Sequence, residues 1–245
     1  MCWYDNYMKK VLILGGSSDI GATLVKRFLE NGYKVHAHYS KNKKNLNLLQ
    51  KKFKNLKLIK SDFLKINERK INNLLKNFKK NKYDIIINLI GFIDNKGYEN
   101  YNFKSLIISL KINAIIPNLI IRENIKYMKK KRWGRIVNCS TVGVKYGGGE
   151  YSFNYNLSKH FLEFIPGKYR EWAANNVLIN NIRIGHAKTK IHKRMKKILK
   201  GTKRIKLIPM KRMINVKEVS EYIFFYSTDL NSYVTGETLS VSGGE

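Results

Sequence analysis

The sequence predicts a single α/β domain built on a parallel sheet, and three observations support this prediction. Short apolar runs alternate with longer segments of helical periodicity along the chain. The apolar runs are continuous, as expected for strands that are buried on both faces. The chain has 245 residues, a length that suits one unit of this class. We therefore expect a doubly wound fold with helices on both faces of the sheet.

The expected elements follow from where these patterns start and stop. Seven strands are predicted, at Lys10–Leu14, Tyr33–Tyr39, Leu56–Lys60, Tyr83–Ile90, Arg135–Cys139, Val177–Ile184 and Leu239–Val241. Helices are predicted over Ile20–Asn31, Ile107–Lys126 and Tyr155–Trp172, and Gly32 is expected to cap the first of them. Right-handed crossovers between parallel strands make this a Rossmann-type domain, whose nucleotide site lies beyond the carboxyl ends of the strands.

No internal repeat, low-complexity block or linker divides the chain, so we expect a short extension at residues 1–8 and one domain at 9–245. The opening residues lack the basic-then-apolar order of a signal peptide. The longest apolar stretch, around Ile85–Ile93, is far below the roughly 20 residues that cross a bilayer. Cys2 and Cys139 are too few for a disulfide framework or a zinc site. We expect a soluble, cytoplasmic protein without a metal.

The charge of the chain is extreme, because 48 basic and 17 acidic residues give a net charge of +31. One interpretation is a polyanionic partner, such as nucleic acid, an anionic membrane or an acidic carrier protein. The other is a codon bias that also enriches Asn, Ile and Tyr. The lysines are spread through every helical segment and form no single stripe, which favours the second interpretation. We expect no specific nucleic acid or membrane partner, only a weak and salt-sensitive affinity for polyanions.

A glycine-rich segment, Leu14–Gly21 (LGGSSDIG), joins the first predicted strand to the first predicted helix. Glycine permits a tight turn and lets backbone N–H groups approach a pyrophosphate, which the helix N-terminus attracts. The segment therefore predicts a dinucleotide site, although such turns also occur for packing reasons. Asp19 is unfavourable beside a pyrophosphate unless its carboxylate points away or caps the helix.

The end of the second strand indicates which dinucleotide is bound. Folds that bind NAD usually carry an acidic residue there, which holds the ribose hydroxyls. Val35–Ser40 contains no acidic residue, and Lys41, Lys43 and Lys44 follow it. These lysines would neutralise a 2′-phosphate, so the sequence favours NADP(H) over NAD(H).

The pattern Tyr-x-x-x-Lys places a phenol and an ammonium on one face of a helix. The ammonium favours the phenolate and lowers a pKa that starts near about 10. Such a tyrosine can exchange a proton with a carbonyl oxygen while hydride moves to its carbon. The pattern occurs three times, at Tyr39/Lys43, Tyr127/Lys131 and Tyr155/Lys159. Only the third follows a glycine-rich loop and a buried strand at the start of a predicted helix, so we expect Tyr155 to be the acid/base.

In order along the chain, these motifs resemble those of the short-chain dehydrogenase/reductase (SDR) family. Leu14–Gly21 is similar to the family's Thr-Gly-x-x-x-Gly-Ile-Gly loop, with Leu14 and Asp19 as departures. Gly134–Thr141 resembles the Gly-Arg-Ile-Val-Asn segment that ends in a catalytic serine, and Tyr233–Gly244 resembles the closing segment. The resemblance covers about Lys9 to Glu245 and implies an NAD(P)-dependent oxidoreductase acting on a CH–OH/C=O pair.

The resemblance also implies roles for individual residues. Counted from Arg135, the serine's role falls on Thr141, fourteen residues before Tyr155, with Ser140 as the alternative. Asn113 matches the asparagine that kinks the fourth helix and holds a water for a proton relay through Lys159. Besides Tyr155 and Lys159, the implied cofactor-binding residues are Gly15, Ser17, Ser18, Asp19, Ile20, Tyr39, Ser40, Lys41, Asp62, Phe63, Asn88, Gly91, Gly185, Ala187 and Thr189.

The sequence therefore predicts hydride transfer between NADP(H) and a small-molecule or carrier-bound carbonyl substrate. A 3-oxoacyl-[acyl-carrier-protein] reductase-like role and a sugar or glycan-precursor dehydrogenase are the two candidates. A basic substrate lid is expected at about residues 190–210, and the resemblance implies a homotetramer, or a homodimer. The alternatives are a cofactor-binding scaffold without turnover, suggested by Asp19, and a basic polyanion-binding protein.

Overall fold

The computed structural model describes residues 7–189 and 203–245. Within them, one sheet of seven parallel strands has the order β3-β2-β1-β4-β5-β6-β7. The strands are β1 (Lys10–Leu14), β2 (Lys34–Tyr39), β3 (Leu56–Lys60), β4 (Ile85–Asn88), β5 (Gly134–Thr141), β6 (Val177–Ile184) and β7 (Thr238–Val241). The predicted doubly wound fold is confirmed.

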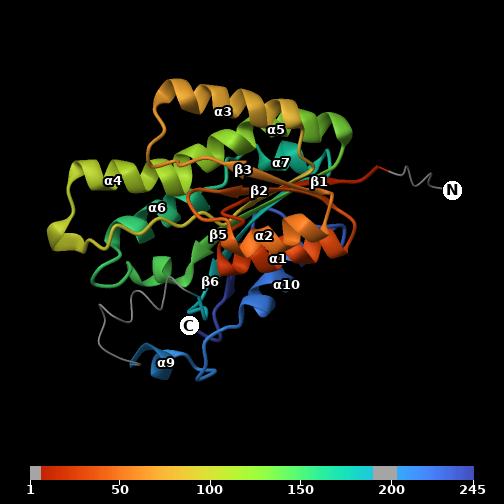
Figure 1. The fold of residues 1–245 in the computed structure, drawn as a ribbon. Helices are drawn as coiled ribbons and strands as arrows, with labels where there is room; N and C mark the ends of the chain where they lie inside the picture. The colour runs from red at the N-terminus through yellow and green to blue at the C-terminus, as the bar shows by residue number, and fades with distance from the viewer. Residues whose placement is uncertain (1–6, 190–202) are drawn as a thin grey trace.

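Helices cover both faces of the sheet (Figure 1). One face packs against α1 (Asp19–Glu30), α2 (Lys44–Lys52) and α10 (Val216–Tyr226). The other packs against α3 (Glu68–Asn81), α4 (Phe103–Leu110), α5 (Ile116–Lys131), α6 (Phe153–Glu163) and α7 (Tyr169–Ala173). A further short helix, α9 (Lys203–Leu207), lies between β6 and α10 in the chain.

Four consecutive residues of strand β1, Val11–Leu14, are apolar because both faces of the strand are buried. Its side chains alternate between the two faces, so Val11 and Ile13 join the core under α1, whereas Leu12 and Leu14 join the core under α3 and α5. All four are fully buried. Each buried aliphatic side chain of this size stabilises the fold by about 1.5–3 kcal/mol.

The predicted single helix over Tyr155–Trp172 is wrong. Helix α6 ends at Glu163, and α7 starts only at Tyr169. Pro166 lies in the gap, where it lacks a backbone N–H and disfavours helical dihedrals in the residue before it. The fourth strand is also shorter than predicted, because Tyr83 and Asp84 precede it and it ends at Asn88.

The predicted helix over Ile107–Lys126 is longer and less regular than expected. Helical structure runs from Phe103 to Lys131, and a π turn at Lys111–Ile115, which contains Asn113, separates α4 from α5. By length and composition alone this stretch could cross a membrane. In this fold it packs against α3 and α6, as a core helix does.

Candidate active site

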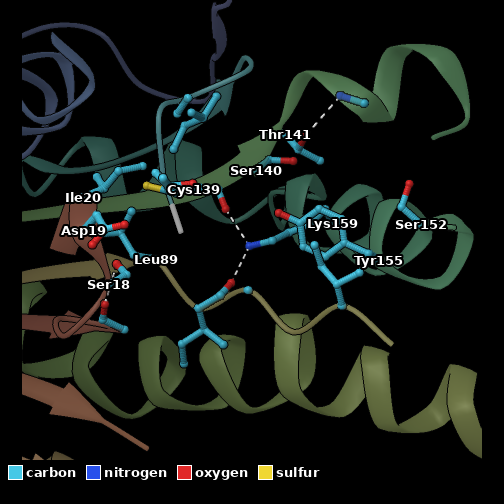
Figure 2. Close-up of a pocket in the computed structure, with 18 of the residues that line it drawn as sticks. Ser18, Asp19, Ile20, Leu89, Cys139, Ser140, Thr141, Ser152, Tyr155 and Lys159 are labelled. Atoms are coloured by element: carbon cyan, nitrogen blue, oxygen red, sulfur yellow. Dashed lines mark hydrogen bonds between the residues drawn. The ribbon is translucent and has the colours of Figure 1, made fainter. Parts of the chain in front are cut away.

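A cavity of about 580 Å³ lies at the carboxyl ends of the strands. Its wall combines the β1–α1 loop, the ends of β2, β4 and β5, the start of α6 and the segment after β6 (Figure 2). Most of the residues singled out by the sequence line it: Gly15, Ser17, Ser18, Asp19, Ile20, Tyr39, Ser40, Lys41, Gly91, Ser140, Thr141, Tyr155, Lys159, Gly185, Ala187 and Thr189. Of the predicted lid, residues 190–202 lie outside the described residues, and Ile205 of α9 reaches the wall.

Asp62, Phe63, Asn88 and Asn113 are not among the described residues that line the cavity. Asp62, Asn88 and Asn113 each accept a hydrogen bond from a backbone N–H group. Asp62 accepts the N–H of Leu64, at 3.2 Å. Asn88 accepts the N–H of Ile90, at 3.2 Å, and Phe63 stacks on the His38 ring. Asn113 accepts the N–H of Phe92 at 2.7 Å and donates to Ser158 Oγ at 2.8 Å. Phe63 and Asn88 therefore contact residues of the wall, Asn113 contacts neighbours of wall residues, and Asp62 contacts its own loop.

Several residues of the wall were not found by the sequence reasoning. Some are neighbours of predicted positions, and the turn between β5 and α6 supplies others, including Val142, Gly143, Gly149 and Ser152. Asn45 comes from α2 and has no local motif that points to the cavity. It reaches the cavity because α2 lies beside the β1–α1 loop, where Asn45 contacts the Ser17 carbonyl.

The β1–α1 loop has the geometry expected of a phosphate-binding turn. Gly15 has a φ of +79°, and a β-carbon there would lie 2.9 Å from the carbonyl group of Leu89, so only glycine fits. Ser18 caps α1, because its Oγ accepts the N–H of Gly21 at 3.0 Å and donates to the Gly15 carbonyl at 2.9 Å. The first N–H groups of a helix have no intrahelical acceptor, so this turn can bind an anion.

Asp19 occupies the first position of α1 and does not cap the helix. A carboxylate in the first turn stabilises the helix dipole but competes with a bound phosphate for the same N-terminus. Asn45 Nδ2 contacts Asp19 Oδ1 at 3.4 Å and donates to the Ser17 carbonyl at 3.1 Å. The Asp19 carboxylate is therefore shared between the helix N-terminus and the α2 side of the cavity.

Helix α6 carries Tyr155 and Lys159 one turn apart, and both line the cavity (Figure 2). The Lys159 side chain is fully buried, and its Nζ donates to the carbonyl oxygens of Ile90, at 2.6 Å, and Cys139, at 2.7 Å. Nζ lies 5.9 Å from the centre of the Tyr155 ring. The two groups are close enough to interact electrostatically.

Burial controls the ionisation of this pair. It lowers the pKa of Lys159 to about 8, because the ammonium is removed from water. It raises the pKa of the Tyr155 phenol, because the phenolate would be desolvated. The expectation that Lys159 lowers the pKa of Tyr155 is therefore not met in this structure. Loss of solvation is the largest cause of the raised pKa of Tyr155.

The two candidate hydroxyls at the end of β5 differ in their contacts. Thr141 Oγ1 accepts the N–H of Gly143 at 3.2 Å, which leaves its own hydrogen free to donate. Ser140 Oγ is buried, and no partner for it exists among residues 7–189 and 203–245. Buried hydroxyls are normally paired, so a group that enters the cavity is a natural partner for Ser140.

The wall fits a dinucleotide. A glycine cradle and a helix N-terminus meet at Gly15–Ile20, and the exposed cation Lys41 lies on the wall beyond β2. The unpartnered Ser140 hydroxyl lies at the end of β5. The volume is also typical of a ligand site.

Comparison with known proteins gives the family. Residues 15–245 match the family model described as enoyl-(acyl carrier protein) reductase. Over 175 residues the chain is 31% identical to the 3-oxoacyl-[acyl-carrier-protein] reductase FabG of Buchnera aphidicola subsp. Schizaphis graminum, with 68% of each chain covered. It is 26% identical, over 96% of each chain, to a 3alpha-hydroxysteroid dehydrogenase of Mediterraneibacter gnavus. The solved structure of ElxO with NADP bound has a TM-score of 0.81 at 24% identity, covering 97% of this chain and 98% of that one.

The fold and the cavity define a nucleotide-binding α/β protein of the doubly wound class. The family match over almost the whole chain identifies the family. The chain belongs to the short-chain dehydrogenase/reductase family and is an oxidoreductase.

We predict that the stability of the protein depends on pH through Lys159. Its folded-state pKa of about 8 lies below the ordinary value of 10.5, so the unfolded chain binds more protons between these two values. Lys159 therefore makes the free energy of unfolding increase as the pH rises from about 8 to about 10.5. Urea unfolding at about pH 7.5 and about pH 9.5 measures this gain, which is expected to be smaller in Lys159→Met. An equal gain in both proteins would contradict the assignment.

Proposed function

We propose that the protein is an NADP(H)-dependent reductase that transfers a hydride to a carbonyl carbon, with Tyr155 as the proton donor. One observation carries this proposal: the Tyr155 phenol, the Lys159 ammonium and a glycine-rich helix N-terminus share one cavity. The bound nicotinamide would supply the hydride. Every other part of the reaction falls to residues of this chain.

The protonation of Tyr155 suits reduction of a carbonyl. Because burial raises its pKa, the phenol is fully protonated at neutral pH and can give its proton to the carbonyl oxygen. Lys159, held by Ile90 and Cys139, keeps a positive charge beside the phenolate that forms. Thr141 is proposed to orient the carbonyl oxygen by donating its hydroxyl hydrogen, with Ser140 as the alternative donor. Asn113 would support the relay of protons to Lys159.

The cofactor is proposed to extend along the cavity from β2 to the segment after β6. The loop residues Gly15–Ile20 would bind the pyrophosphate, and Lys41 would pair with the 2′-phosphate. Asp62, Phe63, Asn88 and Gly91 are proposed for the adenosine half. Gly185, Ala187 and Thr189 are proposed for the nicotinamide half. The similarity to ElxO, whose structure holds NADP, supports this choice of cofactor.

A 3-oxoacyl thioester on an acyl carrier protein is the substrate that we favour. The relatives named 3-oxoacyl-[acyl-carrier-protein] reductases support it, and the net charge of +31 would attract an acidic carrier. A basic lid at about 190–210 would contribute to this attraction. A sugar or glycan-precursor alcohol is the second candidate, because two positions distinguish the chain from the family pattern. Asp19 departs from the family's phosphate loop, and Ile184 stands where the family usually has proline.

We also propose a cytoplasmic homo-oligomer, a tetramer or a dimer, with residues 1–8 as an extension of the domain at 9–245. Phe103 at the start of α4, and Phe161 and Phe164 at the end of α6, are 80%, 54% and 76% exposed. Large exposed apolar side chains on α4 and at the end of α6 favour an interface with another copy. The buried free thiol of Cys139 suits a reducing compartment.

Replacing Tyr155 by Phe tests the mechanism. We expect the rate of NADPH oxidation with acetoacetyl-coenzyme A or a 3-oxoacyl carrier protein to fall by about 10²–10⁴-fold, because the proton donor is lost. The affinity for NADPH, measured by fluorescence, should change little. An unchanged rate would exclude Tyr155 as the acid. Tight NADPH binding without turnover of any carbonyl in the wild-type protein would favour the scaffold alternative.

The two hydroxyls at the end of β5 are separated by a matched pair of variants. Thr141→Val keeps the shape and removes the hydroxyl, and we expect it to lower kcat by about 10²–10³-fold. Ser140→Ala should change kcat by less than about tenfold if Ser140 only completes the wall. Steady-state kinetics at saturating NADPH measure both. The reverse order of effects would give the role to Ser140.

Cofactor preference is tested at Lys41. We expect Lys41→Ala to weaken NADPH binding by roughly five- to tenfold and to leave NADH binding nearly unchanged, because an exposed phosphate contact is lost. Lys43→Ala is the control, since Lys43 is also exposed but is not among the described residues that line the cavity. Fluorescence titrations with both dinucleotides measure this. Tighter binding of NADH than of NADPH to the wild-type protein would contradict the choice of cofactor.

A further inference from the structure

His38, near the end of β2, contacts the phosphate-binding turn with both its ring and its backbone. Its Nδ1 accepts the N–H of Gly15, at 3.3 Å. Its carbonyl oxygen accepts the N–H of Gly16, at 2.8 Å. Residue 38 thus accepts hydrogen bonds from two consecutive N–H groups of the turn, and it is also one of the residues that line the cavity.

The partners of His38 fix its tautomer. Nε2 lies 2.9 Å from the carbonyl oxygen of Ser61, which can only accept, so Nε2 carries the hydrogen. The N–H of Gly15 can only donate, so Nδ1 must present its lone pair. The ring is neutral, and burial, which lowers the pKa of His38 to about 4, keeps it so. Both ring nitrogens are used by backbone groups.

The ring connects three strand ends. Gly15 follows β1, His38 belongs to β2, and Ser61 follows β3. The ring also stacks on Phe63 beyond β3, with 4.6 Å between centroids and 26° between planes. Gly15 is already constrained on its other side by Leu89. The peptide of Gly15 is therefore held between the ring of His38 and the end of β4.

We propose that His38 is a positioning residue for the dinucleotide, which acts by fixing the phosphate-binding turn. It sets the affinity for the cofactor and leaves the rate of hydride transfer nearly unchanged. The inference rests on the proposed function, because it concerns the same cavity. A turn without the ring loses the acceptor of the part-buried Gly15 N–H, so the conformation that binds phosphate is less populated.

The same strand offers a matched control. His36 lies two residues earlier, on the same face of β2, and is buried to a similar extent. Burial lowers its pKa to about 4, and its Nδ1 is hydrogen bonded to the Tyr83 hydroxyl, at 2.8 Å. His36 is not among the described residues that line the cavity. A substitution there removes a buried neutral imidazole without touching the phosphate-binding turn.

The experiment compares His38→Leu, His38→Asn and His36→Leu with the wild-type protein. NADPH fluorescence gives the Kd, steady-state kinetics at saturating NADPH give kcat, and urea unfolding gives stability. We expect His38→Leu to raise the Kd for NADPH by roughly tenfold or more, with kcat within about threefold of wild type. His36→Leu should bind NADPH within about twofold of wild type, despite a similar loss of stability. In His38→Asn, Oδ1 can replace Nδ1 toward Gly15, so part of the affinity should return.

Equal NADPH affinity in His38→Leu and His36→Leu would overturn the inference. So would a loss of kcat in His38→Leu at an unchanged Kd. If His38→Leu does not fold, His38→Asn is compared with His36→Leu instead. The inference is then overturned if His38→Asn binds NADPH as tightly as His36→Leu does. Wild-type protein that binds neither NADPH nor NADH would overturn the proposed function itself, which distinguishes that failure from this one.

Discussion

The contact on which the site depends is the buried ammonium of Lys159 between two backbone carbonyls. A charged group in the interior is costly unless its hydrogen bonds are satisfied, and here the carbonyl oxygens of Ile90 and Cys139 satisfy two of them. These oxygens lie just beyond β4 and within β5, so one side chain joins α6 to two central strands. The arrangement of the sheet ends thereby determines where Tyr155 stands.

The two layers of helices give this contact its rigidity. The core under α1 and the core under α5 lie on opposite faces of the sheet, and the central strands contribute side chains to both. Because packed interiors resist changes of even one methylene, the strand ends can move little relative to each other. The loops that line the cavity are thus held by a scaffold whose own buried residues are mostly aliphatic. The π turn at Asn113 places a polar side chain at the back of this scaffold, where it supports Phe92 and Ser158.

Much of the fold could be predicted because the central strands are buried on both sides. The bounds of β1 and β6 agree with those expected from their apolar runs. The break between α6 and α7 was missed, although Pro166 was visible, because apolar residues continue across it. Helix α3 was not predicted, since its lysines and asparagines obscure a pattern in which only Leu75 and Phe78 are buried. Asn45 and His38 have no motif that points to a role, because their contacts are made with residues distant in the sequence. The pKa of Tyr155 depends on desolvation, which no spacing of residues reveals.

The buried thiol of Cys139 offers a way to measure access to the cavity. Burial raises its pKa to about 12, so at neutral pH almost none of it is the reactive thiolate. Alkylating and oxidising agents should therefore react slowly with this thiol, although Cys139 is one of the residues that line the cavity. In a chain whose other cysteine has been replaced, the rate at which this sulfur is labelled would therefore report how accessible the cavity is at the end of β5.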